Sequence, residues 1–350
     1  MSNLLKMNGI PTFKSKNGFR YPAFWEYYKQ HDRMHWTADE VTLSQDIKDF
    51  QKASDEEKEF ITNVMRLFTQ NEVQVAGSGY TTMLRIFKPI EVHAMLSSFM
   101  AREITHIESY SLFTETIGLP NSIYSEFLDI PVMSNKAEYL EKAKVKKYED
   151  YKAMNMSNHE LDSVYRRDVA RMIAVYAGGT ENISLMAQFA MLLKYQFENK
   201  YPGLCQIVEF SIREETLHGI ANSHLFRTLI AENQDIWDDE LKFDIYEGIR
   251  EIVEYEKALV DYFNPPHMSN ADLKRYIEYR ADIALNELGM KKNYGTTVNP
   301  LPFMDDVVGT VLTDFFSGSV TEYSKSVEGS WGDINYTYWI NGIDVSEDGE

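Results

Sequence analysis

The sequence predicts an all-α protein folded as a bundle of long helices. Apolar residues recur with the 3.6-residue period of a helix from the "SQDIKDF" stretch onward, and alternating β-branched runs are few. Several periodic segments exceed 25 residues, which favours a bundle whose core follows long facing apolar stripes. The expected helices cover residues 55–86, 89–117, 134–152, 160–200 (interrupted near "AGGTEN"), 203–231, 237–262 and 269–288.

Prolines justify the boundaries of these segments. Pro89, Pro120, Pro131 and Pro202 stand at the expected breaks, because proline interrupts a helix interior but is tolerated at its first turn. Before the helices, residues 1–36 are punctuated by Gly and Pro and predict an irregular N-terminal arm. Residues 37–305 carry the helical pattern and predict a single helical domain.

Residues 306–350 lose the helical period. They are rich in Gly and Ser and end in the acidic "DVSEDGE", which predicts a flexible C-terminal tail.

The composition excludes several classes of function. A net charge of −19 over 350 residues argues against broad affinity for nucleic acid or for an anionic membrane. The single cysteine, Cys205, excludes an intrachain disulfide framework and a cysteine-rich metal site, and it fits a reducing compartment. Because neither a signal peptide nor an 18-residue apolar run is present, we expect a cytoplasmic protein without a membrane span.

Two E-x-x-H motifs carry the chemical signal. Glu103 and His106 lie in one expected helix, and Glu215 and His218 lie in another. Residues three apart share a helix face, so each motif presents a carboxylate and an imidazole in the same direction. One such motif alone is more often part of a solvated helix surface. Whether it binds a metal depends on whether further carboxylates lie at suitable places in the other helices.

Lone carboxylates accompany both motifs. Glu72 precedes Glu103 by 31 residues, and Glu181 precedes Glu215 by 34, each within an otherwise apolar helical segment. Each half therefore contains a carboxylate helix, a turn and an E-x-x-H helix. This is the pattern of ferritin-like bundles that hold a dinuclear metal site, with a glutamate from each of two helices and E-x-x-H from the other two.

Charge supports the same interpretation. Two divalent cations neutralise four carboxylates when the imidazoles are neutral, whereas four buried glutamates without metal would be very costly. Mixed carboxylate and imidazole ligands suit iron or manganese better than calcium, and zinc usually prefers closed four-coordinate sites.

A resemblance to a known family rests on these same stretches. "MAREITHIESYSLF" and "SIREETLH", with "TEN" in the intervening helix, resemble the ligand helices of the small, radical-bearing subunit of class I ribonucleotide reductases, and the likeness spans residues 36–323. It implies that the protein supplies a radical to a large catalytic subunit that reduces ribonucleotides to deoxyribonucleotides. It assigns the ligands as Glu72, Glu103 and His106 for one metal, and Glu181, Glu215 and His218 for the other.

The resemblance also assigns the residues that handle the radical. Tyr110, on the helix stripe of Glu103, matches the tyrosine that stores it. Trp36 matches the tryptophan of the long-range radical path, and Glu214 stands where an aspartate usually links that tryptophan to a metal-bound histidine. Tyr323 resembles the tail tyrosine that relays the radical, with Tyr336 and Tyr338 as competitors.

Three departures leave the metal open. Glu72 and Glu214 are each one methylene longer than the family's usual aspartate, and Ser211 replaces a residue that is often apolar beside the radical tyrosine. We expect two iron ions, with two manganese ions or a manganese–iron pair as the alternative. The oxidising equivalent is then stored either on Tyr110 or on the metals.

Partners and rival functions follow from the resemblance. A homodimer is expected, as is a large subunit bound through the tail, and the need for an activating flavoprotein is left open. Another oxygen-activating ferritin-like oxidase would share the six ligands, but it would not need Trp36, Tyr110 and a tail tyrosine together. An iron-storage protein would not explain the tail.

Overall fold

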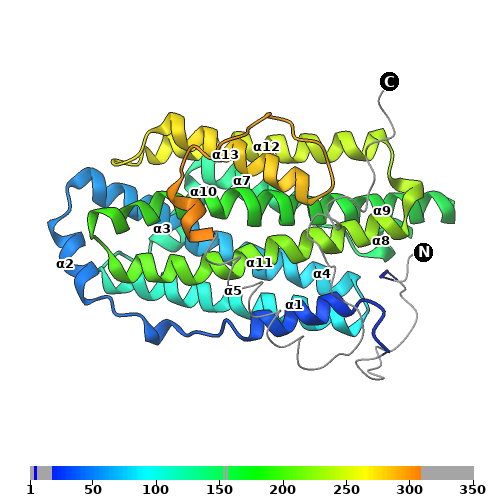
Figure 1. The fold of residues 1–350 in the computed structure, drawn as a ribbon, viewed down its shortest axis with the longest axis horizontal. Coiled ribbons are helices and arrows are strands. Elements are labelled where there is room, and N and C mark those ends of the chain that lie inside the picture. Colours follow the sequence, from blue (N-terminus) through cyan, green and yellow to red (C-terminus); the bar gives the residue numbers. More distant parts are fainter. Residues whose placement is uncertain (1–3, 6–17, 153, 155–156, 309–350) are drawn as a thin grey trace.

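The computed structural model describes residues 4–5, 18–152, 154 and 157–308, and all secondary structure in these residues is helical. This confirms the predicted all-α class. The helices lie mostly along the long axis of the molecule, and α5 and α11 run side by side through its middle (Figure 1). No helix in the described part of the chain is long and apolar enough to cross a lipid bilayer.

The first half of the bundle is one long helical run followed by a second. Ser54 caps the run by accepting a hydrogen bond from the backbone N–H of Glu57. Three acidic residues in the first turn interact favourably with the positive end of the helix dipole. Pro89 separates the two runs at the predicted boundary. The elements are α3 (Asp55–Gln74), η3 (Val75–Tyr80), α4 (Thr81–Ile86) and α5 (Ile90–Thr116).

The second half repeats this plan. Ser157 and Glu160 form a capping box at its start, in which each side chain accepts from the other residue's backbone N–H. Pro202 occupies the first turn of the last helix, where its missing N–H costs nothing. The elements are α9 (Asn158–Ala174), η5 (Val175–Ser184), α10 (Leu185–Leu193), η6 (Lys194–Glu198) and α11 (Pro202–Glu232).

The segments η3 and η5 are π-helical, and each lies close to a lone glutamate of the sequence pattern. Glu72 is two residues before the end of α3, next to η3, and Glu181 lies inside η5. The expected interruption near "AGGTEN" is therefore a widened helix rather than a break. Gly178 and Gly179 allow it to pack tightly, because a Cβ on either would lie 2.9 Å from an isoleucine of α12.

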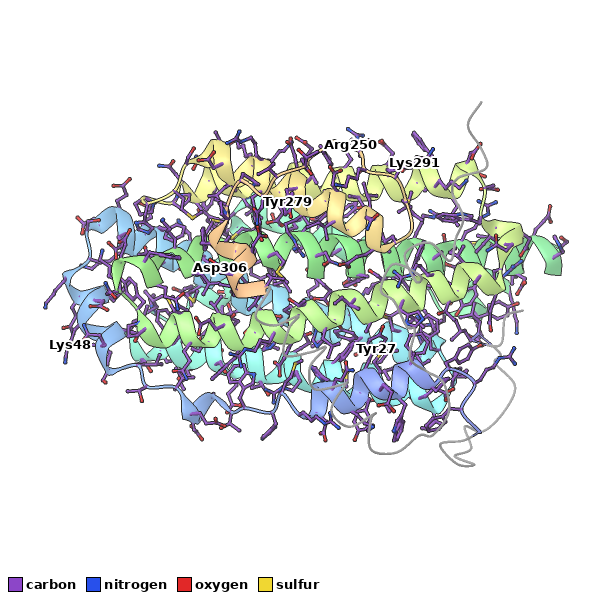
Figure 2. The ribbon with its side chains drawn as sticks, viewed as in Figure 1. Tyr27, Lys48, Arg250, Tyr279, Lys291 and Asp306 are labelled. Atoms are coloured by element: carbon purple, nitrogen blue, oxygen red, sulfur yellow. The ribbon has the colours of Figure 1, made fainter. Side chains whose placement is uncertain are left out.

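The remaining elements cover this core. Helices α12 and α13 pack over η5, and α1 packs against α5 and α11 (Figure 1). The labelled Tyr27 of α1 lies toward α11 (Figure 2), where its hydroxyl is 3.2 Å from His224 Nδ1. These elements are α1 (Pro22–Asp32), η2 (Ala38–Glu40), α2 (Ser44–Lys52), α6 (Ile123–Glu126), η4 (Phe127–Asp129), α7 (Pro131–Lys142), α8 (Tyr148–Lys152), η7 (Gln234–Ile236), α12 (Asp239–Phe263) and α13 (Asn270–Glu287).

Three segments differ from the sequence-based expectation. Residues 303–308 are helical, although the non-helical tail was expected to begin at residue 306. The helix expected over 134–152 is two helices, α7 and α8, separated by a short connection. The N-terminal segment 1–36, expected to be irregular, contains α1. The apolar face of α1 is short, with Phe24 as its one buried hydrophobic residue, so the helical period is difficult to detect in the sequence.

Candidate metal centre

Six buried side chains meet in the middle of the bundle, and they are the six predicted ligands. They come from α3, α5, η5 and α11, and none is more than 1% exposed. The i,i+3 spacing in α5 and α11 directs a glutamate and a histidine inward from each helix. The residues are Glu72, Glu103, His106, Glu181, Glu215 and His218.

Their ligand atoms form two overlapping groups, in each of which the atoms lie within 4.8 Å of one another. One group is Glu72, Glu103, His106 and Glu215; the other is Glu103, Glu181, Glu215 and His218. Because Glu103 and Glu215 belong to both groups, the geometry suits two cations bridged by two carboxylates. We call Glu72 with His106 the His106 half-site, and Glu181 with His218 the His218 half-site.

The Nδ1 atom of each imidazole faces the shared carboxylates. His106 Nδ1 is 3.0 Å from Glu215 Oε1 and 3.5 Å from a Glu103 oxygen. His218 Nδ1 is 3.0 Å from Glu215 Oε2 and 3.1 Å from Glu103 Oε1. The resemblance had assigned Glu103 to one metal and Glu215 to the other, whereas the structure places both between the two half-sites.

Several buried polar atoms of this cluster, although close to one another, make no hydrogen bond of acceptable geometry with another described residue. They include both carboxylate oxygens of Glu72 and of Glu103, one oxygen each of Glu181 and Glu215, and His106 Nδ1. Buried oxygens are normally hydrogen-bonded, because an unsatisfied buried acceptor costs about 1–3 kcal/mol. Their convergence in two groups fits a pair of cations with oxygen and nitrogen ligands.

The electrostatics of the cluster point the same way. Burial, together with neighbouring carboxylates, raises the pKa of Glu72 and of Glu181 well above the usual range. Burial opposes the charged form of His218, but Glu215 and Glu103 outweigh it and raise its pKa to about 9. Four carboxylates in a closed space therefore need positive charge, from protons or from metal ions.

Outside the cluster, His106 is backed by a charged group. Its Nε2 lies 2.8 Å from Glu214 Oε2, which also accepts from Trp36 Nε1 at 3.1 Å. Arg102 completes this arrangement: its Nε donates to Glu214 Oε1 at 2.7 Å, and its guanidinium lies 5.3 Å from the centre of the Trp36 ring. The predicted link from Trp36 through Glu214 to His106 is thus present as a chain of contacts.

The His218 half-site has different outer contacts. His218 Nε2 is 3.0 Å from Nε2 of the buried His31, and Tyr80 donates a hydrogen bond of 2.8 Å to Glu181. Asn222 in turn donates to the Tyr80 hydroxyl at 3.1 Å. The sequence analysis missed His31, Tyr80, Asn222 and Arg102. No local motif marks these four residues, and the hydrogen-bond partners described above lie more than 100 positions away from them in the sequence.

Tyr110 lies fully buried beside the cluster. Its hydroxyl donates to Ser211 Oγ at 3.1 Å, and its ring packs 4.8 Å from that of Phe68. Burial and the nearby Glu72 raise the pKa of Tyr110, so the phenol is neutral. The other predicted tyrosines, Tyr323, Tyr336 and Tyr338, lie outside the described residues.

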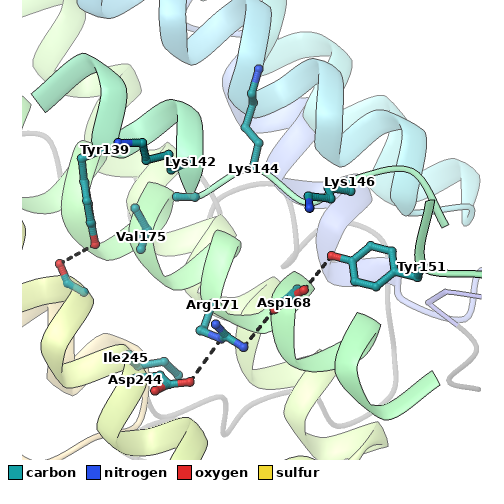
Figure 3. A pocket seen from close by; sticks show the side chains of 12 residues that line it. Tyr139, Lys142, Lys144, Lys146, Tyr151, Asp168, Arg171, Val175, Asp244 and Ile245 are labelled. Carbon is teal, nitrogen blue, oxygen red and sulfur yellow. Dashed lines mark hydrogen bonds and ion pairs between the residues drawn. The ribbon is translucent and has the colours of Figure 1, made fainter. Parts of the chain in front are cut away.

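An open cleft of about 280 Å³ lies elsewhere, between α7, α9 and α12 (Figure 3). Three of its charged side chains pair with one another: Arg171 contacts Asp168 at 2.9 Å and Asp244 at 3.4 Å. Tyr151 also donates to Asp168 at 2.6 Å. None of the six cluster residues lines it. The candidate metal centre is thus enclosed by protein and separate from this cleft.

The fold and this site together define a ferritin-like protein with a buried carboxylate–histidine cluster that is compatible with a dinuclear metal site. The family model described as "Ribonucleotide reductase, small chain" matches residues 15–300. The chain belongs to this family, and it is a small subunit of a ribonucleoside-diphosphate reductase, as the sequence predicted.

Two viral relatives agree with this assignment. "Probable ribonucleoside-diphosphate reductase small subunit 376L" of Invertebrate iridescent virus 6 is 32% identical over 348 residues, covering 90% of this chain and 95% of the relative. "Probable ribonucleoside-diphosphate reductase small subunit 048L" of Invertebrate iridescent virus 3 is 33% identical over 328 residues, covering 91% and 86%.

Solved structures share the fold. The ribonucleotide reductase R2 subunit from Clostridium botulinum has a TM-score of 0.74 at 19% identity, covering 88% of this chain and 99% of that chain. A dimanganese(II)-NrdF of Streptococcus sanguinis has a TM-score of 0.69 at 18% identity, covering 83% and 97%.

Proposed function

We propose that this subunit binds two metal ions with its six clustered ligands and uses them to generate a radical for a large catalytic subunit. The observation that carries this proposal is the convergence of partnerless carboxylate oxygens in two groups that share Glu103 and Glu215. The chemistry that such a metal pair supplies when bound is one-electron oxidation with O₂ as the oxidant. The large subunit then reduces ribonucleotides to deoxyribonucleotides, the precursors for DNA replication.

Tyr110 is the proposed store of the oxidising equivalent. Its phenol is buried beside the His106 half-site, and its hydrogen bond goes to the neutral hydroxyl of Ser211, not to a carboxylate that could take its proton. Water is excluded because the Tyr110 side chain is 0% exposed. A closed, apolar surrounding protects an oxidised phenol from reduction.

Trp36 and Glu214 form the proposed exit for the oxidising equivalent. Glu214 Oε2 lies within hydrogen-bond distance of both Trp36 Nε1 and His106 Nε2, so one oxygen joins the metal-facing histidine to the indole. The rings of Trp36 and His106 are nearly parallel, with centres 6.1 Å apart. Tyr323, in the tail, is the proposed next relay, with Tyr336 and Tyr338 as alternatives.

The proposed metal is iron at both positions, with two manganese ions or a manganese–iron pair as the alternative. The Streptococcus sanguinis protein is described as a dimanganese(II)-NrdF, so this fold accommodates manganese in another protein. Ser211, 3.1 Å from Tyr110, favours the alternative, because a hydroxyl in this pocket changes the environment of the phenol. A dimanganese form would raise the question of an activating flavoprotein.

The proposed assembly is a cytoplasmic homodimer that binds the large subunit through the C-terminal tail. Val73 of α3 and Ile104 of α5 support the dimer, since they are 47% and 55% exposed on adjacent helices. Exposed apolar side chains of this kind are often covered by a second copy. No binding to nucleic acid or membrane is proposed.

Metal analysis with electron paramagnetic resonance tests the function. Protein from its own host should contain two iron or manganese ions per chain and give a tyrosyl signal. The His218→Ala variant should lose at least one ion, while His224→Ala, six residues further along α11, should keep both. A wild-type protein that binds neither metal, or a His218→Ala variant that binds both, contradicts the proposal.

A further inference from the structure

The two metal-facing histidines differ in what holds their outer nitrogen. His106 Nε2 meets the carboxylate of Glu214 at 2.8 Å, whereas His218 Nε2 meets Nε2 of His31 at 3.0 Å. A metal-bound histidine commonly donates its second N–H to a carboxylate, a carbonyl or water. A second imidazole in this position is a different kind of partner, because it accepts the hydrogen bond without a formal charge.

Geometry determines the tautomers along this chain. His218 Nδ1 faces Glu215 and Glu103 at 3.0 and 3.1 Å, so a metal ion held by these residues would bind at Nδ1, which leaves the hydrogen on Nε2. His31 Nε2 must then accept that hydrogen, which places the hydrogen of His31 on Nδ1. That atom is 2.7 Å from Ser98 Oγ, which accepts it.

Packing fixes the His31 ring as well. His31 is 0% exposed and occupies the last turn of α1, the helix that the sequence analysis did not predict. The Phe99 ring packs against both imidazoles: its centre lies 4.7 Å from that of His31 and 4.2 Å from that of His218. Contacts of α1 with both α5 and α11 therefore determine where the acceptor nitrogen stands.

We propose that His31 is a positioning residue that holds His218 in its metal-binding tautomer and orientation, so that occupancy of the His218 half-site depends on the docking of α1. The two half-sites are then unequal. The charged acceptor Glu214 makes His106 more basic. Both oxygens of Glu72 are available as ligands, because neither makes a hydrogen bond. His218 has a neutral acceptor, and Glu181 shares an oxygen with the Tyr80 hydroxyl. The His218 half-site binds its ion more weakly and is filled second.

This inference rests on the proposed six-ligand site, and the two can fail separately. If the wild-type protein does not bind two ions, the proposed function fails. If the wild-type protein binds two ions and the loss of His31 has no effect on either, only the role of His31 fails.

The test is a Mn²⁺ titration of metal-free full-length protein followed by electron paramagnetic resonance. In wild type, the signal of an isolated Mn²⁺ ion should give way to that of a coupled pair as the second ion binds. In His31→Leu, the second ion should bind about 10–100-fold more weakly, which is the usual cost of losing an outer partner of a metal ligand. The first ion should bind as in wild type.

Two further variants separate positioning from general damage. His31→Gln offers an amide oxygen that can accept the same hydrogen bond, and it should restore most of the second ion's affinity. His224→Gln removes the other histidine contact between α1 and α11, with Tyr27, and should change neither affinity. An equal loss in His224→Gln, or no rescue by His31→Gln, overturns the proposal.

A double-mutant cycle identifies the half-site. In a His218→Ala background, His31→Leu should not change the affinity for the remaining ion, because His31 acts only through His218. In a His106→Ala background, His31→Leu should lower the affinity for the remaining ion. The factor should equal the one by which His31→Leu alone lowers the affinity for the second ion. The reverse pattern would assign His31 to the other half-site and overturn the proposal.

Discussion

The hydroxyl groups of Tyr110 and Ser211 lie 3.1 Å apart, and the Ser211 hydroxyl in turn donates a hydrogen bond to the backbone carbonyl of Ile207 at 3.0 Å. Both side chains are 0% exposed. The phenol therefore has a hydrogen-bond partner that is neutral and anchored to its own helix. If this phenol is oxidised, Ser211 is the group that its oxygen meets.

The first prediction concerns Tyr110. After metal loading and exposure to O₂, the wild-type protein should give a tyrosyl signal that is absent from Tyr110→Phe, together with loss of turnover. Ser211→Ala should keep the radical but change its paramagnetic spectrum, because the Tyr110 oxygen loses its hydrogen-bond partner. Turnover that survives in Tyr110→Phe would show that the metals store the oxidising equivalent.

The second prediction concerns the exit through Trp36. Trp36→Phe removes the N–H that donates to Glu214 but leaves the ion pair of Glu214 with Arg102 intact. We expect unchanged metal content and an unchanged Tyr110 signal, with turnover reduced to background. Glu214→Ala is a poor substitute, since an unpaired buried arginine costs about 3–5 kcal/mol in stability. A fully active Trp36→Phe enzyme would exclude Trp36 from the path.

The sequence predicted the six clustered residues because the relevant information is local. An E-x-x-H motif determines a shared helix face by itself, and a lone glutamate in an apolar segment is visible without knowledge of its neighbours. The long helices followed from the same periodicity. The bridging positions of Glu103 and Glu215 did not follow, because they depend on how four helices approach one another.

His31 and Arg102 show what local reasoning cannot reach. His31 contacts His218 across 187 residues, and Arg102 contacts Glu214 across 112. In the sequence, Arg102 is an ordinary charged residue beside Glu103, and His31 lies in a segment with a weak helical period. Their roles arise only when α1 and α11 pack against α5.

The third prediction is a pH dependence of stability at Asp282. This carboxylate accepts hydrogen bonds from the backbone N–H groups of Asn293, Tyr294 and Thr296 and from the Thr296 hydroxyl, at 2.7–2.9 Å, and so fastens the chain that follows α13. Burial opposes the charged form, but these hydrogen bonds outweigh it and lower the pKa of Asp282. A lowered folded-state pKa stabilises the fold above the unfolded pKa of about 3.9, and this contribution is lost as the pH falls through the folded value.

Urea unfolding of wild type and Asp282→Asn measures this effect. At pH 7 the variant should be less stable by about 1–3 kcal/mol, since the amide leaves backbone donors unsatisfied. The difference should shrink as the pH is lowered below about 4. A difference that is constant with pH would show that Asp282 has the same pKa in the folded and unfolded chains.

The fourth prediction concerns the dimer. Ile104→Glu places a charge at the 55% exposed Ile104 of α5, and it should convert a homodimer to a monomer at micromolar concentration by light scattering. Phe243→Glu, at a 63% exposed position on α12, is the matched control and should leave the dimer intact. A wild-type monomer, or dimer loss only in Phe243→Glu, would contradict the proposed interface.

The fifth prediction concerns the C-terminal tail, of which residues 309–350 lie outside the described residues. Its sequence keeps many aromatic residues for a Gly- and Ser-rich segment, whereas disordered segments are usually depleted in them. These residues are Phe315, Phe316, Tyr323, Trp331, Tyr336, Tyr338 and Trp339. Large rings suit anchoring in a partner's groove, and the acidic end suits control of the rate and orientation of binding.

Two variants separate binding from relay. All six clustered ligands precede residue 219, so deletion of residues 325–350 should leave metal content and the Tyr110 signal unchanged while abolishing complex formation with the large subunit. Tyr323→Phe keeps the ring and should bind the large subunit normally, yet it should support no turnover, because a phenylalanine cannot be oxidised at a comparable potential. Activity in Tyr323→Phe would transfer the relay role to Tyr336 or Tyr338, which the corresponding Phe variants would then distinguish. A truncated subunit that still binds and turns over would remove the tail from the partnership altogether.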